Sequence, residues 1–271
     1  MLNARDITLG QYYPGQSAVH RMDPRVKILL LIVFITAVFL PDDLYGLIFS
    51  GLWLVAACRA SKLPFSLLVK GLKPLRVILI FTFVLNVFFS SDKEGALLFD
   101  LGFVSVTQTA FLNALRYLLR LVLLVMGSSM LTLTTPPVTL TDGMERLLSP
   151  LRVFHFPAHE LAMMMTIALR FIPTLLEEAE KIMKAQTARG ADFESGKLLS
   201  RAKAMVPLLV PLFVSSFRRA GDLAMAMEAR CYRGGEGRTR LHVLKVGKND
   251  YLAMAVTGFM LGLVIAQKVI F

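Results

Sequence analysis

The sequence predicts an all-α membrane protein with about five transmembrane helices and one helical domain outside the membrane. Hydrophobic residues make up 55% of the 271 residues, and the mean hydropathy is +0.62, whereas a soluble domain contains about 45–50% apolar residues. The apolar residues are gathered in blocks, as membrane spans require. Residues 132–248 are different, because charges and prolines interrupt long helical patterns there too often for confident spans.

Five apolar segments predict the spans, and they are residues 28–40, 44–58, 77–89, 106–131 and 251–271. The last two are long enough to cross about 30 Å of hydrocarbon at about 1.5 Å per residue. The first three are shorter, so each must recruit flanking residues, tilt or lean on its neighbours. Pro41, Asp42 and Asp43 predict a tight turn between the first two spans.

The positive charges predict the orientation of the chain. Cations are frequent in residues 1–27 and 59–76, whereas the first and third connections hold only Lys93. Because cytoplasmic loops collect Lys and Arg, the N-terminus is predicted to lie in the cytoplasm of a cell-membrane protein. Residues 132–248, with 17 Lys and Arg against 11 Asp and Glu, then lie there as well. The same rule accounts for the net charge of +11, so we expect no nucleic-acid partner.

Three parts follow from these spans. Residues 1–131 form the N-terminal segment and four transmembrane helices, residues 132–248 form the cytoplasmic helical domain, and residues 249–271 form the final transmembrane helix. Two long helices are predicted within the domain, over residues 158–189 and 197–232, each about 50 Å long.

A small-residue frame surrounds an arginine at the end of each long helical pattern. The two motifs are Ala188-Arg189-Gly190 and Ala229-Arg230-Cys231. One interpretation is electrostatic, because a helix C-terminus favours a cation by about 0.3–1 kcal/mol. The other is docking, because a helix tip without bulk can enter a groove and offer a bidentate fork to a carboxylate.

Methionines are concentrated in the same region, which holds eight of the 14 between Met144 and Met227. Flexible thioether side chains suit surfaces that accept several partners, but they also fill ordinary cores. The candidates for a partner surface are Met163, Met164, Met165, Met205 and Met225.

Arg116 and Arg120 fall inside the fourth predicted span and share one face with Asn113. A charged residue within a span is a candidate functional site. The alternative is that this face lines the bundle interior, or that the span begins later in the sequence.

The sequence predicts no cofactor site and no enzymatic activity. The stretch from Gly190 to Leu198 departs from a phosphate-binding loop in its spacing, and leucine stands where Mg²⁺ needs a hydroxyl ligand. His155 and His159 are separated by Pro157 and lack a third ligand for a metal.

Two groups of residues resemble the transmembrane T component of energy-coupling factor (ECF) importers. The first is Asp6-Ile-Thr-Leu-Gly-Gln-Tyr-Tyr-Pro14 followed by His20-Arg-Met-Asp-Pro-Arg-Val-Lys27, which is similar to the start of that family. The second is the pair of arginine motifs, which resemble the family's two Ala-Arg-Gly signatures; Cys231 stands where glycine is usual. The resemblance covers the whole chain.

The resemblance implies a non-catalytic scaffold subunit of an ATP-driven vitamin or micronutrient importer. Its partners would be two ATP-binding-cassette ATPase subunits, which bind ATP and Mg²⁺, and a small membrane S component, which binds the substrate. Each arginine motif would dock on one ATPase, and residues 132–248 would be the coupling domain. One alternative is a conventional permease that carries substrate itself, along a path of Asn86, Asn113, Arg116 and Arg120. An intramembrane enzyme is a second alternative.

Overall fold

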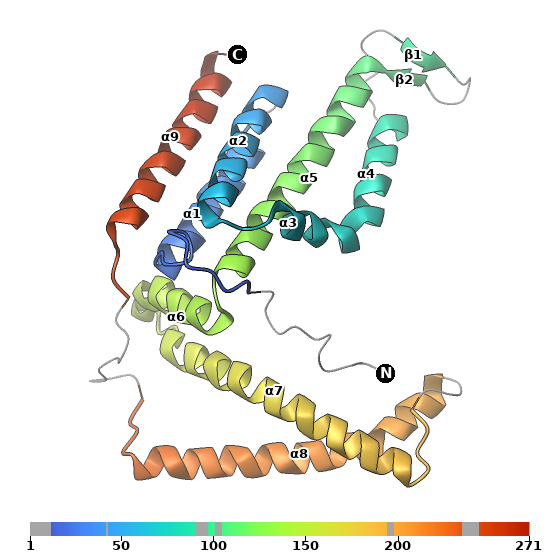
Figure 1. Ribbon diagram of the computed structural model, residues 1–271, viewed down its shortest axis with the longest axis vertical. Helices are drawn as coiled ribbons and strands as arrows, with labels where there is room; N and C mark the ends of the chain where they lie inside the picture. The colour runs from blue at the N-terminus through green and yellow to red at the C-terminus, as the bar shows by residue number, and fades with distance from the viewer. Residues whose placement is uncertain are drawn as a thin grey trace. The chain divides into compact units, whose positions relative to one another are not determined.

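The computed structural model describes residues 12–41, 43–89, 97–100, 105–193, 198–234 and 244–270 (Figure 1). Residues 6–11 of the N-terminal motif and residues 194–197 after the first arginine motif lie outside these ranges. The chain divides into two compact units, and the division falls inside one helix. The first unit described here comprises Gly10–Gly143 and Val243–Phe271, and the second comprises Met1–Leu9 and Met144–His242.

The larger unit is a bundle of four helices with two shorter ones at its side. The four are α1 (Pro24–Phe39), α2 (Leu44–Ser61), α5 (Gln108–Thr134) and α9 (Lys248–Ile270). α1 begins where the Asp23 carboxylate accepts a hydrogen bond from the backbone N–H of Arg25, with proline at the first helical position. α2 ends at Lys62, whose φ of 55° is left-handed.

The core of this unit lies where α1 meets α2, α5 and α9. Phe34 of α1 is fully buried, and its ring stacks on Trp53 with centroids 5.0 Å apart. A Cβ atom at Gly127 of α5 would overlap the Phe34 ring, so α1 and α5 approach closely because that position is glycine.

A bent helical stretch connects α2 to α5. α3 (Phe65–Leu72) and α4 (Arg76–Phe89) are joined by the short 3-10 helix η1 (Lys73–Leu75), where Pro74 interrupts the regular hydrogen bonding. Figure 1 shows α4 turned sharply from α3 and lying beside α5. A small antiparallel hairpin of β1 (Leu97–Asp100) and β2 (Ser105–Thr107) then leads into α5.

Five helical stretches are long and apolar enough to cross a membrane, which confirms the predicted all-α membrane fold. Four of them overlap predicted spans, namely Leu44–Ser61, Phe65–Phe89, Gln108–Thr134 and Lys248–Val269. The fifth is not the first predicted span, because α1 has only 16 residues and is about 24 Å long. It is Ala158–Ala188, which belongs to the predicted cytoplasmic domain.

The second unit is built on two long helices that cross (Figure 1). α6 (Pro137–Leu148) and the 3-10 helix η2 (Ser149–Phe154) precede α7 (Ala158–Ala188) and α8 (Leu198–Ala229). Both predicted long helices are confirmed, and their ends lie within a few residues of the predicted limits. α8 changes direction in its N-terminal part, where Pro207 and Pro211 each remove a backbone donor.

Candidate functional site

The first arginine motif is a helix terminus with a defined backbone geometry. Arg189 is the C-cap of α7, and Gly190 follows with φ of +90°. The N–H of Gly190 donates to the Thr187 carbonyl at 3.0 Å, and that of Ala191 donates to the Gln186 carbonyl at 2.9 Å. This pair of bonds is the Schellman motif, which satisfies carbonyl groups that the helix leaves unpaired.

The second motif ends α8 in the same way, residue for residue. Cys231 has φ of 55°, and its N–H donates to the Glu228 carbonyl at 2.8 Å. The N–H of Tyr232 donates to the Met227 carbonyl at 3.0 Å. The two motifs are therefore one structural device used twice, in which arginine is the last residue before a left-handed turn.

This geometry adds a second reason for the small third residue of each motif. From the sequence, Gly190 and Cys231 are small residues that clear space around the guanidinium. Both are left-handed positions, so the backbone itself favours glycine there. The signal was present in the sequence, because glycine directly after a helical pattern marks a helix end. Cys231 adopts a conformation that costs a non-glycine residue about 1–2 kcal/mol.

Both motifs are open to solvent. All six of their residues are exposed, namely Ala188, Arg189, Gly190, Ala229, Arg230 and Cys231. Neither guanidinium makes an ion pair within the described ranges. Each arginine thus lies beside the negative end of a helix dipole with no ion pair to another described residue, an arrangement suited to an incoming carboxylate.

The crossing of α7 and α8 sets the positions of the two motifs. Figure 1 shows the C-terminal ends of these helices on opposite sides of the crossing. Arg219 of α8 donates to the Glu178 carboxylate of α7 at 2.7 Å and links the two helices. The two arginine-bearing ends are thus separate surfaces on one linked pair of helices.

His159 makes contacts that the sequence did not predict. Its Nδ1 lies 2.9 Å from a carboxylate oxygen of Glu145 in α6, and its Nε2 lies 3.2 Å from the hydroxyl of Tyr232. Tyr232 directly follows the second arginine motif, so the end of α8 is attached to the start of α7. His155 lies before the start of α7, with φ of 59°, and it is not one of the two partners given above for the His159 ring.

Four of the five candidate methionines are exposed on the long helices. The exposed fractions are 55% for Met164, 54% for Met165, 47% for Met205 and 64% for Met225, whereas Met163 is half-buried. These four side chains do not fill a core of this chain. A continuous series of exposed apolar residues accompanies them on α8, including Val206, Leu209, Val210, Phe213, Val214 and Phe217.

Arg120 of α5 is bonded to the end of a neighbouring helix of the bundle. Arg120 donates through Nη2 to the Pro41 carbonyl at 2.6 Å, just beyond the C-terminal end of α1, and its guanidinium stands 5.6 Å from the ring centroid of Phe39. Asn86 donates to the Thr82 carbonyl of its own helix at 2.8 Å. Arg120 and Asn86 are two of the four polar side chains that would line the path of a conventional permease. Both donate hydrogen bonds to backbone carbonyls of this chain.

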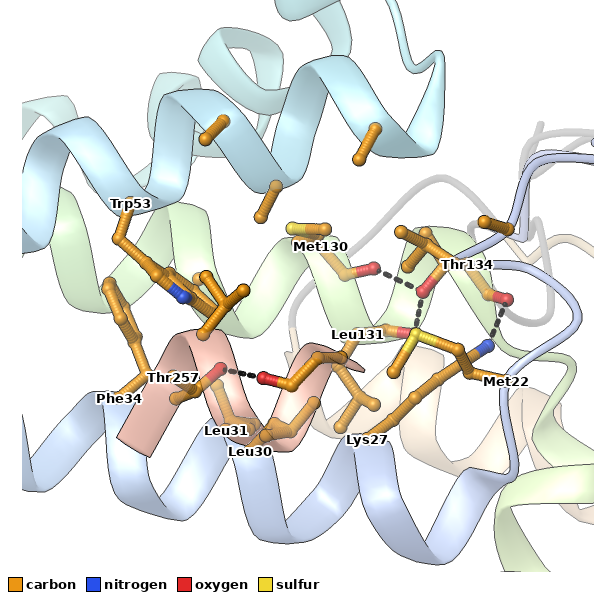
Figure 2. A pocket seen from close by; sticks show the side chains of 18 of the residues that line it. Met22, Lys27, Leu30, Leu31, Phe34, Trp53, Met130, Leu131, Thr134 and Thr257 are labelled. Atoms are coloured by element: carbon orange, nitrogen blue, oxygen red, sulfur yellow. Dashed lines mark hydrogen bonds between the residues drawn. The ribbon is translucent and has the colours of Figure 1, made fainter. Parts of the chain in front are cut away.

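A cavity of about 290 Å³ in the bundle is largely apolar. Figure 2 shows Leu30, Leu31, Phe34 and Trp53 facing it, with Lys27 and Thr134 at one end. Such a lining does not resemble a path for a polar substrate, since it offers few groups to replace water.

The family follows from comparison with known proteins. A family model described as "Cobalt transport protein" matches residues 15–241. The chain is 51% identical over 256 residues to the energy-coupling factor transporter transmembrane protein EcfT of Thermosediminibacter oceani, covering 94% of this chain and 96% of that protein. It is 53% identical over 249 residues to the EcfT protein of Clostridium kluyveri, covering 92% of each. It is 50% identical over 236 residues to the EcfT protein of Bacillus subtilis, covering 87% of this chain and 88% of that protein.

The fold and the comparisons together define a multi-pass membrane transport protein. The chain belongs to the family of energy-coupling factor transporter transmembrane proteins. The resemblance seen in the N-terminal segment and the arginine motifs is confirmed at the level of the family.

Proposed function

We propose that this chain is the scaffold that couples two ATPase subunits to a substrate-binding S component during vitamin or micronutrient uptake. ATP and Mg²⁺ bind to the ATPases, and the chain itself performs no chemistry. The observation that carries the proposal is the repetition of one helix terminus, with an exposed arginine before a left-handed residue, on two separate ends of α7 and α8. Two equivalent ends suit two equivalent grooves on an ATPase dimer.

The orientation belongs to the same proposal. The N-terminus and the coupling domain lie in the cytoplasm, where ATP is available, as the distribution of Lys and Arg favours. α7 then lies outside the hydrocarbon although its composition would let it span, and its exposed apolar face contacts the S component or the membrane surface.

The test reverses the charge of both arginines. In the double variant Arg189→Glu with Arg230→Glu, co-purification of the ATPases should fall at least about a hundredfold, because two docking contacts are each replaced by a repulsive charge. Uptake of riboflavin, folate and biotin, each assayed separately as a radiolabelled probe, should be lost while the chain still inserts in the membrane. Either single variant should weaken the complex less.

A matched control is available on the same helices. Arg170 of α7 and Arg218 of α8 are exposed, so Arg170→Glu with Arg218→Glu makes the same change in net charge away from the helix ends. This control should retain the ATPases. The proposal is wrong if the motif variant keeps assembly and uptake, or if the control loses both to the same extent.

A further inference from the structure

The first turn of α1 contacts two segments of the larger unit, one that leads toward the second unit and one that leads back from it. The first follows α5 at Thr134 and Thr135, before this unit ends inside α6, and the second is residues 244–247, which lead into α9. Residues 23–27 contact both segments. They belong to the N-terminal motif that carries the family resemblance, and the docking proposal gives them no role.

Lys27 holds the outgoing segment. The residue is only 6% exposed. Its Nζ donates to the Thr134 carbonyl at 3.0 Å, the Thr135 hydroxyl at 3.1 Å and the His20 carbonyl at 3.3 Å, and Figure 2 shows the first of these bonds. An ammonium group has three donors, so all of them are used. Because Thr134 is the last residue of α5, the charge also sits at the negative end of that helix dipole.

Arg25 reaches the returning segment. Its Nη2 donates to the Leu244 carbonyl at 3.3 Å and to the Asp23 carboxylate at 2.7 Å. Its Nε donates to the same carboxylate at 3.0 Å, which fixes the plane of the guanidinium. The Asp23 side chain has no exposed surface and that of Arg25 is 26% exposed, so water screens this ion pair from the arginine side only.

Asp250 connects the start of α9 to the same point. It is 2% exposed, and one carboxylate oxygen accepts the backbone N–H of Asp23 at 3.1 Å. The other accepts the N–H of Gly247 at 2.7 Å. Gly143 of α6 packs on the Pro24 ring so closely that an added Cβ would lie 2.9 Å from it.

The four charged side chains therefore form one cluster, defined as Asp23, Arg25, Lys27 and Asp250 and called here the root clamp. Burying charges is expensive, and well-packed apolar residues are often at least as stabilising as a buried ion pair. Stability alone therefore does not account for the cluster. What charged groups supply is directional bonding, which here fixes the outgoing and returning backbone at one point.

We propose that Arg25 and Lys27 are positioning residues for energy coupling, which hold both connections of the coupling unit on the first turn of α1. A displacement that reaches Thr135 or Leu244 is then passed to the ends of α5 and α9 together, because both segments are bonded to the first turn of α1. The inference rests on the proposed coupling function, and it adds residues far in sequence from the arginine motifs.

The experiment uses the intact complex in proteoliposomes with Lys27→Met and Arg25→Met. Each variant should assemble with the ATPases and hydrolyse ATP, but riboflavin, folate or biotin imported per ATP hydrolysed should fall at least about fivefold, a loss of about 1 kcal/mol of coupling. Arg21→Met is the matched control, because Arg21 is an exposed cation in the same segment whose side chain, among the described residues, contacts Gln16 at 3.4 Å. An assembled variant with the wild-type ratio of uptake to hydrolysis overturns the inference.

A second measurement needs no partner subunit. In detergent, Lys27→Met should speed amide hydrogen exchange in residues 134–143 at least about threefold and leave residues 244–250 unchanged, while Arg25→Met should do the reverse. If either variant speeds amide hydrogen exchange equally in both segments, or in neither, then Lys27 and Arg25 do not hold separate segments. That result contradicts the root clamp even where assembly with the ATPases is impaired. If the Arg189 and Arg230 variants still bind ATPases, the docking proposal fails while this exchange pattern is unaffected, so the two failures are distinguishable.

Discussion

The third residue of each arginine motif has a left-handed backbone, and in only one of the two is that residue glycine. A Cβ atom at Gly190 would meet nothing within 4 Å, so the only obstacle to a larger residue there is its φ of +90°. Cys231 already accepts this cost at the end of α8. The two helix ends thus share a hydrogen-bond pattern and differ in the conformational energy needed to keep it.

Exchanging these residues should change the stability of the two helix ends in opposite directions. Gly190→Ala should destabilise the end of α7 by about 1 kcal/mol, and Cys231→Gly should stabilise the end of α8 by a similar amount. Amide hydrogen exchange should become about fivefold faster at residues 186–191 in the first variant. It should become about fivefold slower at residues 227–232 in the second.

Gly221 provides the control for this prediction. It lies inside α8 with an ordinary helical backbone and also has nothing within 4 Å of an added Cβ. Gly221→Ala should therefore slow local exchange, because alanine is the better helix former by about 0.5–1 kcal/mol. If Gly190→Ala also slowed exchange, the left-handed turn would not control the end of α7.

The two arginines could be predicted from the sequence, but the left-handed backbone of Gly190 and Cys231 was not predicted. Arg189 and Arg230 were recognisable because the same short pattern ends two helical stretches. The Tyr232–His159–Glu145 contacts were not recognisable, since they join residues up to 73 positions apart that no periodicity relates.

At the scale of the helices, α7 and α8 carry apolar side chains that the chain does not cover. Met164 and Met165 lie on the N-terminal half of α7, well before its arginine-bearing end. Unbranched thioether side chains adapt to differently shaped neighbours at small cost, which suits a surface that contacts more than one partner.

Polar substitution of the α7 methionines should separate the two kinds of partner. In the triple variant Met163→Gln, Met164→Gln and Met165→Gln, co-purification of an S component should fall at least about fivefold, because apolar contact area is lost. Binding of the ATPases should be retained, as the arginine motif of α7 lies at its opposite end.

Met144→Gln is the matched control for this variant. Met144 is 48% exposed on α6, so the change adds the same polar group at another exposed site of the unit. It should leave both partners bound. Equal loss of S component and ATPases in the triple variant would instead indicate that the unit had misfolded.

The helices themselves were largely predictable, and the exceptions have physical causes. Long apolar periodicity and the breaks at Gly190 and Gly234 located α7 and α8. The bend between α3 and α4 depends on packing beside α5 as well as on Pro74, so a hydropathy pattern alone cannot show it. The root clamp was equally hidden, because Asp23 and Asp250 are 227 residues apart.

For the whole molecule, the choice of spans is the main difference between expectation and structure. α1 is short but lies at the centre of the bundle, whereas α7 is long and apolar but has little of its surface buried. A short helix can reach the interfaces when its neighbours and flanking residues compensate. Composition alone therefore cannot decide which of these two helices crosses the membrane.

The native cysteines can decide the side on which the second unit lies. Cys231 is exposed, whereas Cys58 is 4% exposed within the bundle. In cells that express the chain alone, a membrane-impermeant maleimide should label Cys231 in inside-out vesicles and not in intact cells. Cys231→Ser should remove the signal, and labelling of intact cells would contradict the cytoplasmic orientation.

The exposed apolar residues of α7 and α8 also affect how fast the chain is degraded in the cell. Phe213 and Phe217 are 61% and 75% exposed, and exposed apolar side chains of this kind favour recognition by quality-control proteases when no partner covers them. A copy synthesised in excess of its partners should therefore turn over faster than an assembled copy. The abundance of this subunit should then follow the supply of its partners rather than its own rate of synthesis.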